Sequence, residues 1–159
     1  MKTIEAKNFG ILPNGEISKK LEALFESLEN SAEETTVLFE KGTYYIDAEN
    51  CKKRKLFVTN TVGDKEFSND ETPHLVPCAF FLSGVSNVIV DGNDSVFVVD
   101  GKATNAALEN CENVTLKNLE IRHAHPDMHE LKVLRKGLFF VDFEVDRDSR
   151  YELKGGKLR

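Results

Sequence analysis

Apolar side chains recur at helical spacing in one stretch near the N-terminus of the chain. Five apolar residues fall at i, i+4, i+7, i+8 and i+11, and so line one face of a helix: Ile17, Leu21, Leu24, Phe25 and Leu28. The pattern predicts an amphipathic helix with Ser18 as its N-cap and with Asn30 and Ser31 closing the run. We find no second stretch with this spacing.

The rest of the chain alternates short, β-rich apolar runs with turn residues. Strands are expected at 36–39, 43–46, 56–59, 79–82, 88–90, 96–99, 114–116 and 119–121. Residues 60–77 are polar, contain two prolines and are expected to form a long loop. Because no helices separate the strands, the pattern argues against a doubly wound parallel sheet.

Two of the strand-forming stretches align with each other. Residues 82–92 (LSGVSNVIVDG) match residues 108–118 (LENCENVTLKN) at an offset of 114 − 88 = 26 residues, with Leu, Asn and Val identical at matched positions. Such spacing, with Gly or Asn at the corners, is typical of stacked β-solenoid rungs, in which these residues take bends of positive φ. A meander of hairpins could produce the same spacing by accident, so both arrangements remain open.

Composition narrows the function without naming it. The chain has 159 residues, which fits one domain, and 21 Lys and Arg against 27 Asp and Glu give a formal charge of −6. An acidic chain without a long basic run is a poor candidate for binding nucleic acid. No apolar stretch is long enough for a membrane helix, and no apolar segment of the signal-peptide type follows the first lysine. A cytoplasmic location and a processed exported protein both remain open.

The cysteines, the basic run and three aspartates are expected to have structural rather than catalytic roles. Cys51, Cys78 and Cys111 are far apart and odd in number, which favours reduced thiols over a disulfide framework. The basic run 52–55 is short, and we expect it to form a solvated loop. Three aspartates lie beside glycines or at predicted corners and are expected to serve turn geometry: Asp91, Asp94 and Asp100.

Several stretches resemble a known group of enzymes. Residues 8–15 (NFGILPNG) and 37–44 (VLFEKGTY) are similar to the N-terminal cap and first rung of right-handed parallel β-helix glycosidases of the pectate-lyase-like superfamily. Residues 53–61, 88–102 and 111–118 (CENVTLKN) together resemble glycoside hydrolase family 110. These are inverting α-galactosidases that remove terminal α-1,3-linked galactose.

The resemblance implies a fold and a division of the chain. We expect a mainly β protein, the N-terminal part of a right-handed parallel β-helix with one N-terminal capping α-helix, over residues 1–134. Residues 135–159 would be the first strands of an inserted β-barrel. The stretches 139–145 and 151–158 look like the first hairpin of that barrel.

The resemblance also implies what the chain lacks. Enzymes of the family run to several hundred residues, and their catalytic carboxylates would lie after Arg159, so no catalytic residue is assigned here. The chain would be the N-terminal fragment of an inverting exo-α-galactosidase, inactive by itself. Its partner would be a carbohydrate with terminal α-galactose, bound by the full-length parent. Neither a metal nor an organic cofactor would be needed, and we expect no nucleic-acid or membrane partner.

Candidate substrate-binding residues follow the strand at 119–121. His125, Asp127 and Glu130 could line a cleft beside a β-helix, although His125 stands where the family usually has an acidic residue. His123, His125 and His129 form an H-x-H-x3-H pattern, which suggests metal binding. Because Pro126 breaks any helix that would bring the third histidine onto the same face, we favour a solvated or sugar-facing cluster.

Two further functions stay open on the sequence alone. The chain could be a stand-alone β-solenoid module that binds glycan or serves assembly. It could also be a fragment of a polygalacturonase-like or lyase-like β-helix enzyme. If the chain is a truncated solenoid, its unfinished last rung exposes apolar edges, so we expect self-association through residues 114–145, as a dimer.

Overall fold

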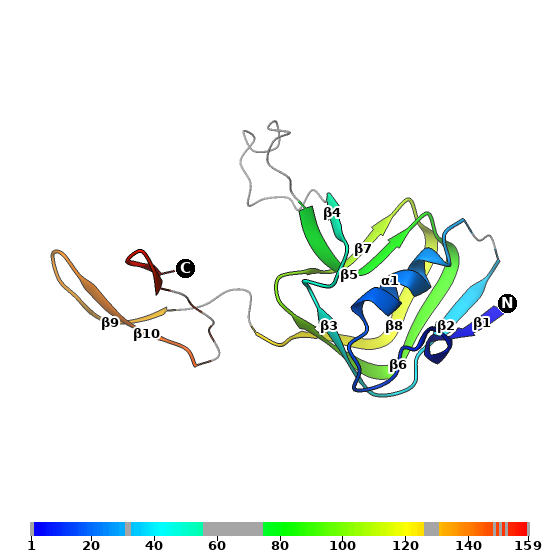
Figure 1. Cartoon of the computed structure of the whole chain (residues 1–159), viewed down its shortest axis with the longest axis horizontal. Coiled ribbons are helices and arrows are strands. Elements are labelled where there is room, and N and C mark those ends of the chain that lie inside the picture. The colour runs from blue at the N-terminus through cyan, green and yellow to red at the C-terminus, as the bar shows by residue number, and fades with distance from the viewer. Residues whose placement is uncertain are drawn as a thin grey trace.

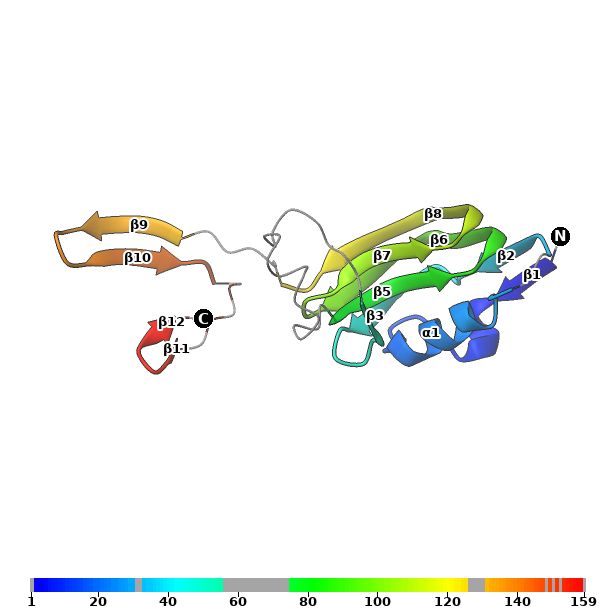
Figure 2. The same cartoon turned by 90° about the horizontal axis from the view of Figure 1, so that it is seen from above.

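The computed structural model describes residues 2–30, 33–55, 75–125, 131–147, 149, 151 and 153–158. The described part is mainly β, with one α-helix, as the sequence predicts. Figures 1 and 2 show a stack of long strands with helix α1 on one side, and two small hairpins outside the stack. No helix in the described part is long and apolar enough to cross a membrane.

The main sheet is parallel and is built around the long strand β6 (Ser86–Asp100). On one edge, β2 (Thr35–Leu38) pairs with the first half of β6 and β3 (Thr43–Asp47) with the second half. β8 (Glu112–His123) pairs with β6 along both halves of its other edge. β1 (Lys2–Glu5) extends the sheet beyond β2, so strands from distant parts of the sequence lie in successive layers.

A second parallel pair forms another face of the stack. β5 (Leu75–Ser83) pairs with β7 (Thr104–Glu109), and the short β4 (Lys53–Lys55) adds to β5 in the antiparallel direction. Leu82 lies opposite Leu108, as Val88 lies opposite Val114, so β5–β7 and the first half of β6–β8 share the offset of 26 residues; beyond the register shift in β6–β8 the offset is 119 − 95 = 24. The predicted parallel stacking of 88–90 on 114–116 is therefore confirmed, and a hairpin meander is excluded for these strands.

The strand boundaries differ from the prediction at two places. β5 begins at Leu75, inside the segment 60–77 that was expected to be a loop, because β4 pairs with its first residues. β6 and β8 each run through two predicted strands, since the layer beneath supplies pairing partners on both sides of the corner. The predicted strand 56–59 and residues 60–74 lie outside the described residues.

Asparagine and glycine form the corners, as predicted. Asn87 and Asn113 occupy the same corner in successive layers, with φ of 56° and 54°, and the Asn113 amide donates a hydrogen bond of 2.8 Å to Oδ1 of Asn87. Gly84 and Asn110 repeat this pattern, with φ of 60° and 51°. Glycine and asparagine adopt this left-handed conformation at the lowest cost, so a periodic pattern of these residues bends each layer at the same place.

Helix α1 (Ser18–Glu26) covers the stack on the side opposite β8, as Figure 2 shows. The five residues of the predicted apolar stripe are all buried. The predicted N-cap is wrong by one residue: Ile17 occupies that position, without a side-chain cap. The Ser18 hydroxyl instead accepts a hydrogen bond from the Asp47 backbone N–H at 2.9 Å, which ties the start of the helix to the end of β3. A short 3₁₀ helix, Ala6–Phe9, precedes α1.

The core is centred on an aromatic cluster around Phe97. Its ring stacks on Tyr44, with centroids 5.1 Å apart, and meets Phe39 and Phe80 edge to face at 5.2 and 5.0 Å. Phe25 from α1 packs on Phe80, with centroids 5.7 Å apart. Because the rings come from the helix, the β2–β3 turn, β3, β5 and β6, the cluster joins the cap to the stacked layers.

The C-terminal part forms two antiparallel pairs. β9 (Leu131–Lys136) pairs with β10 (Val141–Val145), and β11 (Leu153–Lys154) pairs with β12 (Lys157–Leu158). The expected pairing of 139–145 with 151–158 is therefore wrong, because β10 takes the preceding strand as its partner. The division of the chain between residues 134 and 135 stays a prediction; β9 extends across it.

Candidate functional site

The face of the stack opposite α1 has no strand over it in the described part of the chain, and we call it the open layer, made of β7 and β8. Each of these strands pairs along one edge only within the described residues. The inward side chains of β8 are half-buried and Leu108 on β7 is exposed, whereas their partners one layer beneath are fully buried. The side chains of β7 and β8 are therefore accessible for contact with another molecule.

The histidines lie at the end of the open layer. His123 ends β8, and its Nε2 lies 2.7 Å from Oδ1 of Asn105 on β7, so the ring joins the two faces of the layer. The backbone N–H of Ala124 donates to the carbonyl of Val99 at 2.8 Å, which continues the pairing with β6. His125 follows and is half-buried.

The structure places only one of the three predicted substrate-binding residues. His125 lies just beyond the end of β8, while Asp127 and Glu130 fall in 126–130, outside the described residues. Their role therefore stays a prediction. His129 lies in the same segment, and no group of three metal-ligating side chains comes together in the described part.

Asp91 holds a corner rather than a catalytic position. Its carboxylate accepts hydrogen bonds from the Asn93 backbone N–H at 3.0 Å and from the Asn118 amide at 2.9 Å, and Lys117 Nζ lies 3.3 Å away. Burial acts to raise the pKa of this carboxyl, but the hydrogen bonds and Lys117 outweigh burial and lower it. Asp91 is thus ionised at neutral pH and serves the turn, as predicted.

The other corner aspartates also lie where the backbone turns or pairs with the neighbouring strand. Asp94 has a φ of 55°, and its exposed carboxylate lies 3.8 Å from Lys41 Nζ. Asp100 ends β6 in register with Asp47, and its carbonyl accepts the Ala48 N–H at 2.9 Å. These positions favour turn geometry over proton transfer.

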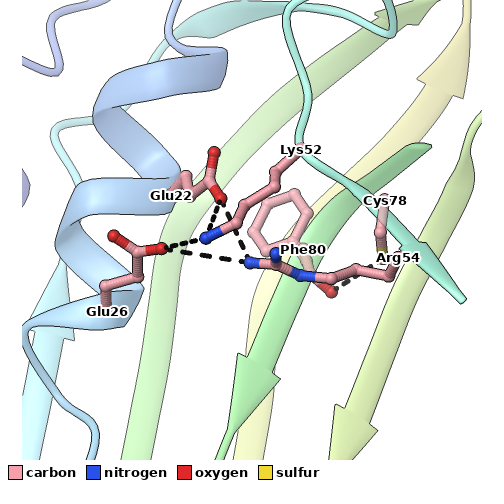
Figure 3. Close-up of polar contacts among 6 residues, drawn as sticks. All are labelled: Glu22, Glu26, Lys52, Arg54, Cys78 and Phe80. Carbon is pink, nitrogen blue, oxygen red and sulfur yellow. Dashed lines mark hydrogen bonds and ion pairs between the residues drawn. The ribbon is translucent and has the colours of Figure 1, made fainter.

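A charge cluster joins α1 to β4, and we call it the helix clamp: Glu22, Glu26, Lys52 and Arg54 (Figure 3). Lys52 Nζ lies 2.8 Å from Glu26 and 3.5 Å from Glu22, and Arg54 Nη2 lies 3.1 Å from Glu22. The prediction that 52–55 forms a solvated loop is wrong for 53–55, which form β4, and Arg54 is half-buried; Lys52 lies outside the strand and is exposed, although it is ion-paired. Strand alternation directs Arg54 toward the helix.

Arg54 is the inner member of the helix clamp. Its side chain is only 19% exposed, and the guanidinium carbon lies 4.6 Å from the centre of the Phe81 ring. The stem and the planar head therefore cover apolar surface beside α1. The sequence contains a pattern that could have indicated this cluster. Glu22 and Glu26 are four residues apart and share one helix face, and Lys52 and Arg54 are two residues apart and share one side of an extended strand.

Two cysteines line the small pocket under the helix clamp. Burial raises the pKa of the Cys78 thiol to about 11 and also raises that of Cys51, so both are protonated at neutral pH. Cys78 Sγ donates to the Phe80 carbonyl at 3.5 Å. Protonated, buried thiols of this kind are inert as nucleophiles, which agrees with the predicted reduced cysteines.

Two further ion-paired carboxylates, those of Glu26 and Glu120, also suit structural roles. Hydrogen bonding to Lys52 lowers the pKa of Glu26, and hydrogen bonding to Arg122 lowers that of Glu120. A general acid in glycoside hydrolysis needs a raised pKa instead. The lowered pKa values of these carboxylates, like that of Asp91, therefore favour structural roles.

The fold and this site define a class first: a mainly β protein of layered parallel strands with a helical cap and an incomplete last layer. No protein-family model matches the chain. It is similar to α-1,3-galactosidase A of Bacteroides thetaiotaomicron, with 27% identity over 136 residues, which cover 86% of this chain and 23% of that protein.

Two further relatives carry related names. α-1,3-Galactosidase B of Phocaeicola vulgatus is 26% identical over 148 residues, which cover 90% of this chain and 23% of the relative. α-1,3-Galactosidase A of Bacteroides fragilis is 24% identical over 159 residues, which cover 99% and 26%. The resemblance to α-1,3-galactosidases is thus confirmed, and the chain spans about a quarter of the length of these curated relatives.

Proposed function

We propose that this chain is the N-terminal part of an inverting exo-α-galactosidase that hydrolyses terminal α-1,3-linked galactose. The observation that carries the proposal is the similarity along 86–99% of the chain to relatives named for that activity. These relatives are named as galactosidases, which favours this substrate class over a polygalacturonase or a lyase. The partner would be a carbohydrate with terminal α-galactose.

The proposal includes a fold. Residues 1–134 would be the first layers of a right-handed parallel β-helix with α1 as its N-terminal cap, and residues 135–159 would begin an inserted β-barrel. The parallel pairs at an offset of 26 residues and the asparagine corners support the first part. The antiparallel β9–β10 pair supports the second.

In this proposal the chain supplies a scaffold and one wall of the cleft. An inverting glycosidase uses one carboxylic acid to protonate the leaving oxygen and a second carboxylate to activate water, with no metal or cofactor. The catalytic pair would lie after Arg159. His125, Asp127 and Glu130 would contact the sugar beyond the end of β8, and the chain alone would be inactive.

The test begins with the coding region after Arg159. We expect it to continue into further layers with clustered aspartates, and a stop codon directly after Arg159 would contradict the proposal. The longer protein should release galactose from an α-1,3-linked galactobiose, with the β-anomer appearing first in a proton NMR time course. The 159-residue chain should release none, and turnover by it would contradict its role as an inactive fragment.

A further inference from the structure

We propose that the open layer of this chain pairs with a second copy of itself. β8 would lie antiparallel to β8 of the second copy, across a two-fold axis that passes through the corner at Lys117 and Asn118. The proposal concerns the 159-residue chain and does not depend on its sugar chemistry. In a longer protein the same edge could accept a further strand.

The inward side of β8 is less covered than that of the layer beneath it. Its inward residues Val114 and Leu116 are half-buried, although Val88 and Val90 directly beneath them are 0% exposed. The same holds beyond the corner, where four residues form two pairs between layers: Leu119 over Ser95, and Ile121 over Phe97. On β7, Leu108 is 48% exposed, whereas its partner Leu82 is fully buried. An edge strand with exposed apolar positions is a template for pairing.

The order of residues along β8 favours pairing of its free edge with β8 of a second copy. The inward residues Val114, Leu116, Leu119 and Ile121 are arranged symmetrically about the corner. In an antiparallel pair centred there, Leu116 meets Leu119 of the other copy and Val114 meets Ile121. A two-fold interface requires this kind of self-complementary surface. Inward residues therefore meet inward residues on both sides of the axis.

The charges of β8 agree with the same register. Every directly opposed pair avoids like charges: Glu112 with His123, Asn113 with Arg122, Thr115 with Glu120, and Lys117 with Asn118. Like charges directly opposite each other destabilise a strand pair, so their absence along the whole edge favours this register. α1 lies on the other side of the stack and leaves the edge open (Figure 2).

The hairpin β9–β10 offers a competing surface. Val133 and Phe143 are opposite each other and are 58% and 40% exposed. Association through this hairpin would place the contact far along the sequence from the β8 corner. The experiment must therefore separate the two surfaces.

Sedimentation velocity of the purified chain over a range of concentrations provides the test. Thr115 and Glu120 are both exposed, so substitutions at 115 need not disturb the core. Thr115→Glu places a carboxylate opposite Glu120 twice per dimer and should raise the dimer Kd by about tenfold, whereas Thr115→Lys should lower it. Val133→Lys serves as the hairpin control and should leave the Kd unchanged. Circular dichroism verifies that each variant folds.

Each outcome decides the proposal. A concentration-dependent dimer that weakens in Thr115→Glu, strengthens in Thr115→Lys and ignores Val133→Lys supports pairing of β8 with β8. A strictly monomeric chain overturns it. A dimer that responds to Val133→Lys and not to either change at Thr115 also overturns it, because the contact would then be the hairpin.

Discussion

At the scale of single residues, Asp91 links the local sequence to the stacking of layers. Its carboxylate holds the turn at Asn93 in its own layer and the amide of Asn118 in the next. The turn role could be predicted from Asp-Gly in the sequence. The contact with Asn118 could not, because it depends on the register shift between the halves of β6 and β8.

Asp91 should make the stability of the chain depend on pH. Its pKa is lower in the folded chain than its ordinary value of 3.8, so its contribution is present above that value and is lost as pH falls through the folded pKa. Asp91→Asn should lower the free energy of unfolding by about 1 kcal/mol at pH 6 and by less near pH 2. Urea unfolding at both pH values measures this difference.

The control for that experiment is another corner aspartate. Asp94→Asn removes a carboxylate that is 73% exposed and lies 3.8 Å from Lys41, a weak, solvent-screened pair. Asparagine also tolerates the positive φ at this position. We expect no difference from the parent chain at either pH. Equal losses at pH 2 and pH 6 in Asp91→Asn would contradict the argument.

At the scale of elements, local patterns predicted α1 better than its attachment. The apolar stripe predicted the buried face of the helix. Ser18 does not cap the helix, because its hydroxyl is hydrogen-bonded to the backbone of Asp47 at the end of β3. The basic run 52–55 looked like a solvated loop, since its partners Glu22 and Glu26 lie on a helix far away in sequence. Contacts between elements were thus the part that single stretches could not show.

The helix clamp should stabilise the chain mainly through Arg54. Arg54→Ala removes a half-buried pairing with Glu22 and the cover over Phe81, and we expect a loss of about 1–2 kcal/mol in the free energy of unfolding. Because part of that loss is packing, that part should persist in 1 M salt. At this concentration the Debye length is about 3 Å, so the exposed ion pairs are screened. Chemical denaturation at low and high salt measures both parts.

Lys53 gives the matched control for Arg54. It is the neighbour on β4, faces away from the helix and is exposed. Lys53→Ala should change the free energy of unfolding by less than about 0.5 kcal/mol. An equal effect of the two substitutions would show that Arg54 is an ordinary surface charge.

At the scale of the whole molecule, the offset of 26 residues predicted how layers stack, and the corners followed from Asn and Gly. The partner of β10 could not be predicted, because two short strands carry no register signal that selects β9 over the tail. The candidate site was less predictable still. The structure describes His125, whereas Asp127 and Glu130 lie outside the described residues.

The layered structure predicts a gradient of backbone stability across the molecule. β6 is paired on both edges and its inward residues are fully buried, β8 is paired on one edge, and every residue of β9 is exposed. Amide hydrogen exchange should therefore be slowest in β6, intermediate in β8, and about a hundredfold or more faster in β9 than in β6. Exchange measured by mass spectrometry on peptides from the three strands tests this order, and protection of β9 equal to that of β6 would contradict it. If β8 pairs with a second copy, its protection should also rise with protein concentration, and Thr115→Glu should shift that rise to about tenfold higher concentration without altering β6.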